Sequence, residues 1–195
     1  MNFLAHLYLS GEPSELMVGN FIADSVKGSS VLNFSEGIQK GIKLHRSIDM
    51  YTDAHAIVQQ SKERLRIRYK KYAPVISDIF YDHFLAVNWS KYSAISLKNY
   101  TTRIYSFLEN YYAVFPERSK QFFQYMIRYD ILYNYSNIAG IQKVLNGMSS
   151  RASFNSGMET STEELDIYYS EFKSEFEQFF PDLQQHVNEF LQTND

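Results

Sequence analysis

Helical periodicity along almost the whole chain is the feature that most limits how this sequence can fold. Between residues 162 and 180, apolar side chains recur at the three- and four-residue spacing of a single helix face. The members of this stripe are Leu165, Tyr168, Tyr169, Phe172, Phe176 and Phe179. Strand-like alternation is scarce, and only four prolines and eight glycines interrupt the 195 residues. The sequence therefore predicts an all-α protein.

The predicted helices leave little of the chain uncovered. Pro74, Pro116 and Pro181 each fall where we expect one helix to end and the next to begin. The predicted helical ranges are 14–28, 35–53, 54–72, 75–89, 96–114, 117–134, 137–148, 162–180 and 182–192. Residues 149–161 form the one long polar loop. Because composition does not change across any loop, we predict a single-domain helical bundle over residues 1–195.

The composition excludes several classes of protein. Apolar residues make up 45% of the chain, with 15 Phe and 16 Tyr, which is typical of a well-packed globular protein. The absence of cysteine excludes disulfides, thiolate metal sites and thiol catalysis. A net charge of −3 gives no global basic field, so we expect no nucleic-acid partner. No uncharged apolar run reaches about 18 residues and the N-terminus lacks a basic start, so we expect no membrane span and a cytoplasmic location.

The segment KLHRSIDMYTD contains the first sign of a functional site. Ile38 and Ile42 share an arc of about 60° on the helical wheel with His45 and Asp49, at about 100° per residue. The stripe that should face the core therefore becomes ionisable halfway along its helix. A buried ionisable group needs a partner or a metal ion, because leaving it unpaired costs several kcal/mol.

The same change from apolar to ionisable recurs on two other predicted helices. Asp24 ends one apolar stripe, and His83 ends another with Asp82 on its flank. His6 lies within the apolar run at the N-terminus. These nitrogen and oxygen ligands suit Mn²⁺, Fe²⁺, Mg²⁺ or Zn²⁺, and they could converge in one cavity.

A structural interpretation of the same residues stays open. A single histidine on an apolar stripe is more often a hydrogen-bonded core residue, and an aspartate four residues after a histidine is often a surface pair. Asp53 fits an N-cap for the helix predicted to begin at Ala54. His55 and His186 follow no such pattern, and we expect them to be structural or exposed. No glycine-rich phosphate loop and no G-x-S-x-G motif is present, which disfavours nucleotide kinases, dehydrogenases and serine hydrolases.

A basic segment, SKERLRIRYKK, stands out in this acidic protein. It holds six of the nineteen Lys and Arg residues. The candidates for contact with a partner are Arg64, Arg66, Arg68, Lys70 and Lys71. They fit either a solvated helix face or a docking surface for an acidic macromolecule.

Five separated segments resemble one known family. MNFLAHLYLS, GNFIADSVKG, GIKLHRSIDMYTD, DHFLAVNWS and VLNGMSSR, in this order, look like the bacterial acyl carrier protein phosphodiesterase family, a divergent relative of the HD-type metal phosphohydrolases. The resemblance implies an all-α, HD-domain-like fold. It also implies hydrolysis of holo-acyl carrier protein at the phosphodiester that joins 4′-phosphopantetheine to a serine. The products would be apo-acyl carrier protein and free 4′-phosphopantetheine.

The resemblance also implies roles for individual residues. Mn²⁺ is the expected cofactor, with Mg²⁺ or Fe²⁺ as alternatives. The implied metal ligands are His6, Asp24, His45, Asp82 and His83. We expect Asp49 to orient a ligand or accept a proton. Arg46, ahead of Arg128 and Arg151, would offset charge on the phosphoryl oxygens. Acyl carrier proteins are small and acidic, which favours the basic segment as a docking surface.

Two other functions remain compatible with the sequence. The first is a metal phosphohydrolase of a small-molecule phosphate ester or nucleotide, which would need no docking surface for a protein. The second is a helical binding protein with buried His–Asp pairs, which would carry no stoichiometric metal.

Overall fold

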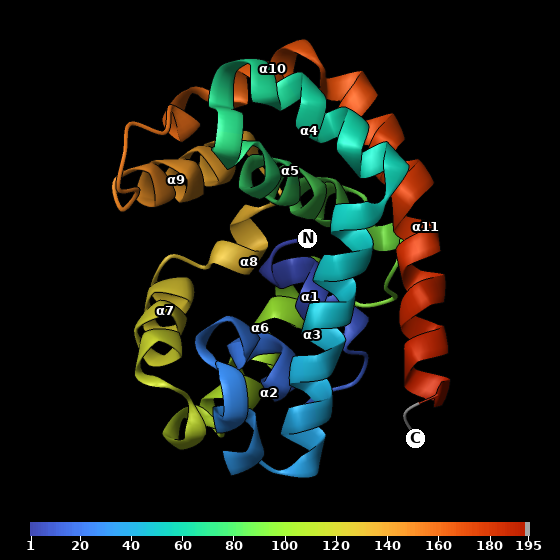
Figure 1. Cartoon of the computed structure of the whole chain (residues 1–195), viewed down its shortest axis with the longest axis vertical. Coiled ribbons are helices and arrows are strands. Elements are labelled where there is room, and N and C mark those ends of the chain that lie inside the picture. The colour runs from blue at the N-terminus through green and yellow to red at the C-terminus, as the bar shows by residue number, and fades with distance from the viewer. Residues whose placement is uncertain (194–195) are drawn as a thin grey trace.

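The computed structural model describes residues 1–193, and within that range it contains eleven α-helices, six short 3₁₀ helices and no strand (Figure 1). The α-helices are α1 Phe3–Leu9, α2 Glu15–Ile22, α3 Glu36–Ala54, α4 Ala56–Tyr69, α5 Ala73–Val87, α6 Leu97–Glu109, α7 Glu117–Arg128, α8 Ile131–Asn134, α9 Ile138–Ser149, α10 Thr162–Ile167 and α11 Tyr169–Thr193. The 3₁₀ helices are η1 Ala23–Ser25, η2 Gly28–Asn33, η3 Lys70–Tyr72, η4 Trp89–Lys91, η5 Tyr112–Val114 and η6 Met158–Thr160. The all-α prediction is confirmed, and the last two residues of the predicted domain lie outside the described range.

Several predicted boundaries are wrong. Helix α1 forms in the N-terminal run, where we predicted no helix. The predicted helix 117–134 is two helices, because Asp130 takes a left-handed conformation (φ 46°) between α7 and α8. Pro181 lies inside α11 instead of ending it. Buried residues on both sides of this proline, Phe179 and Phe180 before it and Leu183 after it, hold the helix together across the lost hydrogen bond.

Helix α5 lies against α1, α4, α9 and α11 and forms the centre of the fold (Figure 1). The core between α5 and α11 is aromatic, and its side chains are fully buried. Its members are Phe80, Tyr81, Phe84, Phe172, Phe176, Phe179 and Phe180. Burying an aromatic side chain stabilises a fold by about 1.5–3 kcal/mol, so this layer anchors α11 over much of its length.

Helices α2 and α3 cross at unusually close range because glycines face each other at the crossing. A Cβ atom on Gly19 would lie 2.0 Å from the carbonyl oxygen of Ile38. A Cβ atom on Gly41 would lie 2.0 Å from the carbonyl oxygen of Leu16. Only glycine fits at these two positions, and the crossing brings the residue after Gly19 next to the helical turn that follows Gly41.

No helix within residues 1–193 is long and apolar enough to cross a membrane.

Candidate active site

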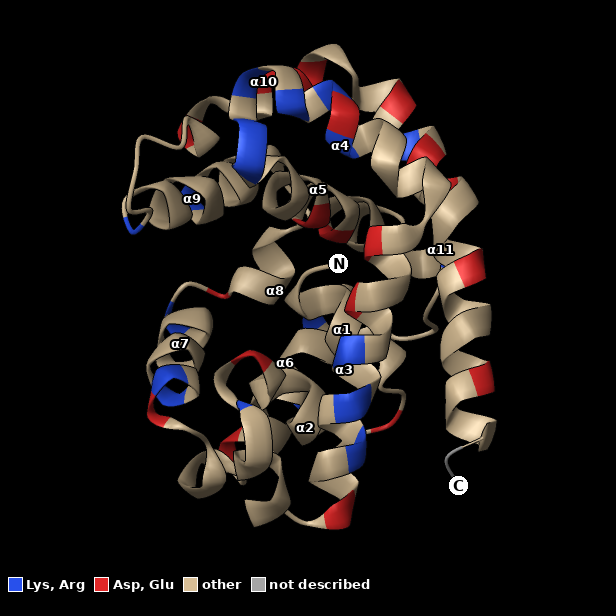
Figure 2. Cartoon of the chain, in the orientation of Figure 1, with Lys and Arg blue, Asp and Glu red and all other residues tan. Residues whose placement is uncertain are grey.

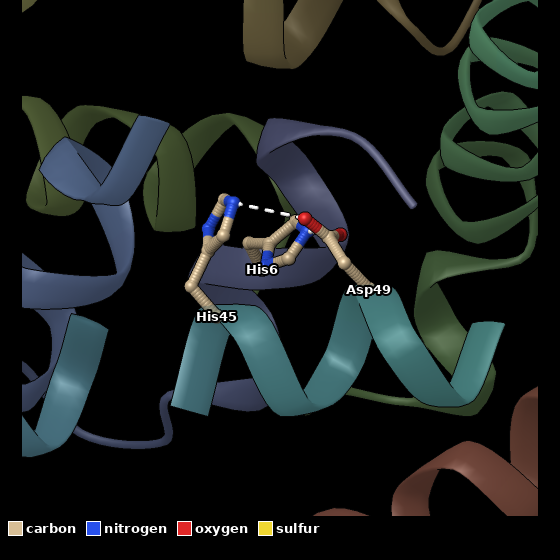
Figure 3. A group of neighbouring side chains, drawn as sticks. All are labelled: His6, His45 and Asp49. Atoms are coloured by element: carbon tan, nitrogen blue, oxygen red, sulfur yellow. Dashed lines mark hydrogen bonds and ion pairs between the residues drawn. The ribbon is translucent and has the colours of Figure 1, made fainter. Parts of the chain in front are cut away.

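Two histidines and an aspartate converge at the junction of α1 and α3. His6 comes from α1, and His45 and Asp49 lie one turn apart on α3 (Figure 3). The Nε2 atom of His6 lies 3.1 Å from Asp49 Oδ1, and the Nε2 atom of His45 lies 3.1 Å from Asp49 Oδ2. One ligand atom from each residue lies within 4.8 Å of the others. Among the described residues this is the one group of three acidic or histidine side chains that meets this spacing.

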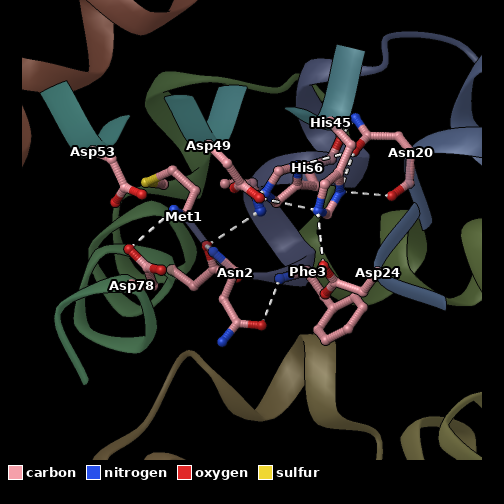
Figure 4. Close-up of polar contacts among 12 residues, drawn as sticks. Met1, Asn2, Phe3, His6, Asn20, Asp24, His45, Asp49, Asp53 and Asp78 are labelled. Carbon is pink, nitrogen blue, oxygen red and sulfur yellow. Dashed lines mark hydrogen bonds and ion pairs between the residues drawn. The ribbon is translucent and has the colours of Figure 1, made fainter. Parts of the chain in front are cut away.

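Asp24 stands at the open side of this cluster. It lies in η1, and its Oδ1 is 3.4 Å from His45 Nε2 (Figure 4). Its side chain is 64% exposed, compared with 43% for Asp49. The structure therefore brings together four of the residues predicted for the site: His6, Asp24, His45 and Asp49.

Asn20 on α2 contacts the Nδ1 atoms of both imidazole rings. Its Oδ1 lies 2.9 Å from His6 Nδ1 and 3.1 Å from His45 Nδ1, and its carbonyl oxygen lies 2.9 Å from His45 Nδ1. The sequence motif that contains Asp24 also contains Asn20, but we did not predict a role for it. A polar side chain within the apolar run MVGNFI was the available signal.

The pKa values of the two histidines are shifted in opposite directions. Burial, followed by the positive charge of His45, lowers the pKa of His6. Burial alone would also lower the pKa of His45, but Asp24 and Asp49 outweigh it and raise that pKa to about 9. Burial opposes ionisation of Asp49, yet the two histidines outweigh it and hold the Asp49 pKa well below its usual range. Without a bound cation, a neutral His6 stacks on a protonated His45, with ring centroids 4.1 Å apart.

This arrangement leaves a polar conflict that a cation would remove. A neutral imidazole has one N–H, but both nitrogens of His6 face acceptors: Asn20 Oδ1 and Asp49 Oδ1. Protonating His6 as well would stack two buried positive rings. A cation between the Nε2 atoms and Asp49 satisfies every atom. The 3.1 Å separations agree with this, since two ligand atoms at right angles, each about 2.1 Å from one octahedral ion, are about 3 Å apart.

The cluster opens on a cavity of about 360 Å³. The polar groups in its lining are His6, Asp24, His45, Asp49, Thr52, Asp53 and Asp78. The α-amino nitrogen of Met1 lies 3.0 Å from Asp78 Oδ1 (Figure 4). The apolar and aromatic part of the lining includes Phe3, Phe122, Tyr125, Ile131, Val144 and Met148. The cavity thus joins a centre suited to a phosphate and a cation to a wall suited to a longer uncharged group.

Asp53 does not cap the following helix, so that prediction is wrong. Helix α3 continues to Ala54, and the N-cap of α4 is His55, whose side chain makes no capping hydrogen bond. Asp53 lies within α3, and its carboxylate accepts a hydrogen bond from Lys62 Nζ at 2.7 Å.

Asp82 is fully buried, but its oxygens are occupied by backbone groups of α1. Oδ2 accepts from the N–H of Leu4 at 2.7 Å, and Oδ1 accepts from the N–H groups of Asn2 at 3.1 Å and Ala5 at 3.3 Å. Asp82 thereby satisfies the free donors at the start of α1 and fixes the helix that carries His6. It does not line the cavity.

His83 points away from the cluster. Its Nδ1 lies 2.8 Å from the carbonyl oxygen of Tyr135, and its Nε2 lies 3.1 Å from the hydroxyl of Tyr169. The structure therefore does not bring Asp82 and His83 together with the other predicted ligands.

The three predicted phosphate-binding arginines lie in different places. Arg46 is exposed and donates to the carbonyl oxygen of Val26 at 3.2 Å, and it does not line the cavity. Arg128 lies over the ring of Tyr129. Arg151 lines the cavity, with its guanidinium 5.8 Å from the ring centre of Tyr125.

Part of the predicted docking surface is engaged within the chain. Arg64 makes a bidentate ion pair with Glu175 of α11, with N–O distances of 2.7 and 2.8 Å. Arg68 contacts Glu163 at 2.7 Å and Glu164 at 3.2 Å. Figure 2 shows basic and acidic residues on α4, α10 and α11 in this part of the molecule. The remaining candidates are Arg66, Lys70 and Lys71.

The fold and the site define an all-α protein with a histidine–aspartate cluster in the wall of a cavity. The chain belongs to the acyl carrier protein phosphodiesterase family, whose model matches residues 1–183. It is 34% identical to the acyl carrier protein phosphodiesterase of Photorhabdus laumondii over 182 residues, 93% of this chain and 92% of the relative. The corresponding protein of Escherichia coli O6:H1 is 32% identical over 192 residues, 96% of this chain and 98% of the relative.

No solved structure matches the chain. The HD-domain-like detail of the predicted fold therefore stays a prediction.

Proposed function

We propose that this protein hydrolyses the phosphodiester between 4′-phosphopantetheine and a serine of holo-acyl carrier protein. The observation that carries the proposal is the cluster of His6, His45 and Asp49 in the lining of a cavity that also has an apolar wall. Membership of the family supports the identity of the substrate. The reaction yields apo-acyl carrier protein and free 4′-phosphopantetheine.

We propose a divalent cation as cofactor, with Mn²⁺ expected and Mg²⁺ or Fe²⁺ as alternatives. The Nε2 atoms of His6 and His45 and the carboxylate of Asp49 would hold it, and Asp24 would complete the set from the open side. Such a cation supplies Lewis-acid activation of water and of a phosphoryl oxygen.

The chain's own groups would order the rest of the reaction. Both Asp49 oxygens face imidazoles, so Asp49 orients the two rings. Hydrogen bonding to His45, partly opposed by burial, lowers the pKa of Asp24 and keeps it ionised. Because Asp24 is the more exposed carboxylate and stands at the open side of the cluster, we assign to it the acceptance of a proton from the attacking water. The water oxygen bonds to phosphorus, the bond from phosphorus to the serine oxygen breaks, and a proton passes to that oxygen.

Arg151 takes over the role predicted for Arg46. Its guanidinium lines the cavity and can offset charge on the equatorial phosphoryl oxygens. The apolar wall would hold the uncharged pantetheine arm and keep the phosphate beside the cluster. Its residues nearest to Arg151 in sequence are Val144 and Met148 of α9.

The test is a mass measurement on holo-acyl carrier protein incubated with the purified protein and Mn²⁺, with and without a chelator. We expect the carrier to lose one phosphopantetheine and the chelator to prevent this. Asp24→Ala should be inactive while keeping its helical circular dichroism. An unchanged carrier with Mn²⁺ bound would contradict the proposed substrate.

The engagement of Arg64 and Arg68 by carboxylates of the same chain supports a second candidate, hydrolysis of a small-molecule phosphate ester or nucleotide. Charge reversal at Arg66, Lys70 and Lys71 separates the two candidates. A carrier-protein substrate should show a raised KM that depends on salt, because docking would lose favourable charge pairs. A small molecule should show an unchanged KM. Glu substitution at half-buried Lys173, on α11 and outside the basic segment, is the control.

A further inference from the structure

We propose that Asn20 is a positioning residue that keeps a ring hydrogen of both site histidines on Nδ1, so that Nε2 is the nitrogen that each ring offers to a cation. This inference concerns the cation site of the proposed function, but the position of the ring hydrogens is measurable without any turnover. Asn20 touches neither the cavity nor the reacting atoms, and it acts through the two imidazoles.

The orientation of the Asn20 amide is determined by its neighbours. The side chain is 1% exposed, and its Nδ2 donates to the carbonyl oxygen of His6 at 2.9 Å and to Ser10 Oγ at 2.9 Å. Ser10 Oγ donates its own hydrogen to that same carbonyl, so it can only accept from Asn20. The amide nitrogen is therefore on the side of Ser10, and Oδ1 must face the imidazoles (Figure 4).

An oxygen acceptor in this place decides which nitrogen carries the hydrogen. Without it, a neutral His6 would donate from Nε2 to Asp49 Oδ1, which lies 3.1 Å away. That bond would occupy the lone pairs that a metal ion needs from both residues. Oδ1 of Asn20, at 2.9 Å, gives Nδ1 an acceptor of its own, and a hydrogen placed there leaves Nε2 free to face Asp49 and a cation. Outer-sphere acceptors commonly orient metal-binding histidines in this way.

The two rings depend on the Asn20 side chain to different degrees. His45 Nδ1 also faces the backbone carbonyl of Asn20 at 2.9 Å, which no substitution removes. His6 Nδ1 has only the side-chain oxygen. Loss of the side chain should therefore release His6 and leave His45 unchanged, an asymmetry that a general loss of packing would not produce.

The decisive experiment is ¹⁵N NMR of the imidazole nitrogens in the chelator-treated full chain. The resonances are assigned with variants in which one histidine at a time is replaced. In the wild type we expect Nδ1 of both His6 and His45 to be protonated. In Asn20→Leu, the Nδ1 resonance of His6 should move to the position of an unprotonated nitrogen, and that of His45 should stay. Asn20→Ala, which removes the same oxygen, is the second variant if the leucine side chain prevents folding.

Two further variants separate positioning from simple structural support. Asn20→Asp keeps an acceptor oxygen toward both rings, and it should keep the Nδ1 hydrogen on His6. Ser10→Ala removes a neighbour of Asn20 in the same buried network without touching either Nδ1 atom, and it should leave both rings unchanged. A His6 that keeps its Nδ1 hydrogen in Asn20→Leu, or carries it on Nε2 in the wild type, would overturn the inference.

Binding of Mn²⁺ alone, measured by calorimetry, gives a second readout. We expect Asn20→Leu to weaken it about 10–100-fold, the usual effect of losing an outer-sphere partner, and Asn20→Asp to restore most of it. Equal affinity in Asn20→Leu and the wild type would contradict the positioning role. If the NMR results hold but holo-acyl carrier protein is not cleaved, the proposed function is wrong and the role of Asn20 stands.

Discussion

Helices α3 and α5 carry the same sequence pattern, an apolar stripe that becomes ionisable, but they use it differently. On α3, His45 and Asp49 line the cavity beside His6, and the Nε2 atom of His45 faces a carboxylate oxygen of Asp49. On α5, Asp82 and His83 have their polar atoms taken up by backbone groups and a tyrosine hydroxyl. The comparison shows that a buried ionisable residue on a core stripe can be expected to have a polar partner. Which partner it finds decides whether the residue belongs to a candidate reactive centre or only makes a structural hydrogen bond.

The largest expected difference between the two helices is in turnover. His45→Ala removes a residue of the cluster, and we expect kcat/KM for holo-acyl carrier protein to fall by more than about 100-fold. His83→Ala should keep most of the turnover, since the hydrogen bonds of its ring go to Tyr135 and Tyr169 and the residue does not line the cavity. Steady-state kinetics on both variants, at the same metal concentration, checks this. Equal losses would mean that α5 contributes a ligand after all.

Asp82→Ala should act mainly on stability. It leaves three N–H groups at the start of α1 without this acceptor, two of them buried, at a cost of about 1–3 kcal/mol for each unsatisfied buried group before relaxation. We expect the free energy of unfolding to fall by about 3 kcal/mol, measured by urea titration. Asp49→Ala is the control, because it should weaken Mn²⁺ binding more and stability less. The reverse order would contradict the structural role of Asp82.

The raised pKa of His45 predicts how cation binding depends on pH. A proton on Nε2 competes with the cation, and the pKa of His45 is about 9. Apparent Mn²⁺ affinity should therefore rise about tenfold per pH unit below that value. In the cation-free protein, the same shift stabilises the fold fully below about pH 6.5, and this contribution is lost as the pH rises through about 9. Calorimetry and thermal melts across this range test both, and a flat affinity profile would rule out His45 as a ligand.

The smallest effect is expected from His83→Gln. The amide can keep a hydrogen bond to the carbonyl oxygen of Tyr135, so the loss of the second bond should cost about 1 kcal/mol. Turnover should not change. A thermal melt and a kinetic assay on one preparation are sufficient, and a turnover loss without a change in stability would be unexpected for a structural histidine.

Sequence reasoning found much of the site for a physical reason that applies beyond this protein. His6, Asp24, His45 and Asp49 were singled out because ionisable groups on core-facing stripes need partners, and these four did find one another. It missed Asn20 because the search was for ionisable groups, and the side chain of asparagine is neutral. It favoured Arg46 over Arg151 because Arg46 is close to His45 along the chain, whereas only the folded structure shows that Arg151 lines the cavity and Arg46 does not.

The sequence by itself determined the all-α class and most helix positions, because these follow from local periodicity and from the scarcity of prolines and glycines. Only the tertiary structure decided which ionisable residues share a cavity. The close crossing permitted by Gly19 and Gly41 presses Asn20 against the imidazole of His45. The carboxylate of Asp82 accepts hydrogen bonds from N–H groups at the start of α1 and is therefore not part of the cluster. These arrangements depend on contacts between residues far apart in the chain, and no local sequence pattern predicts them.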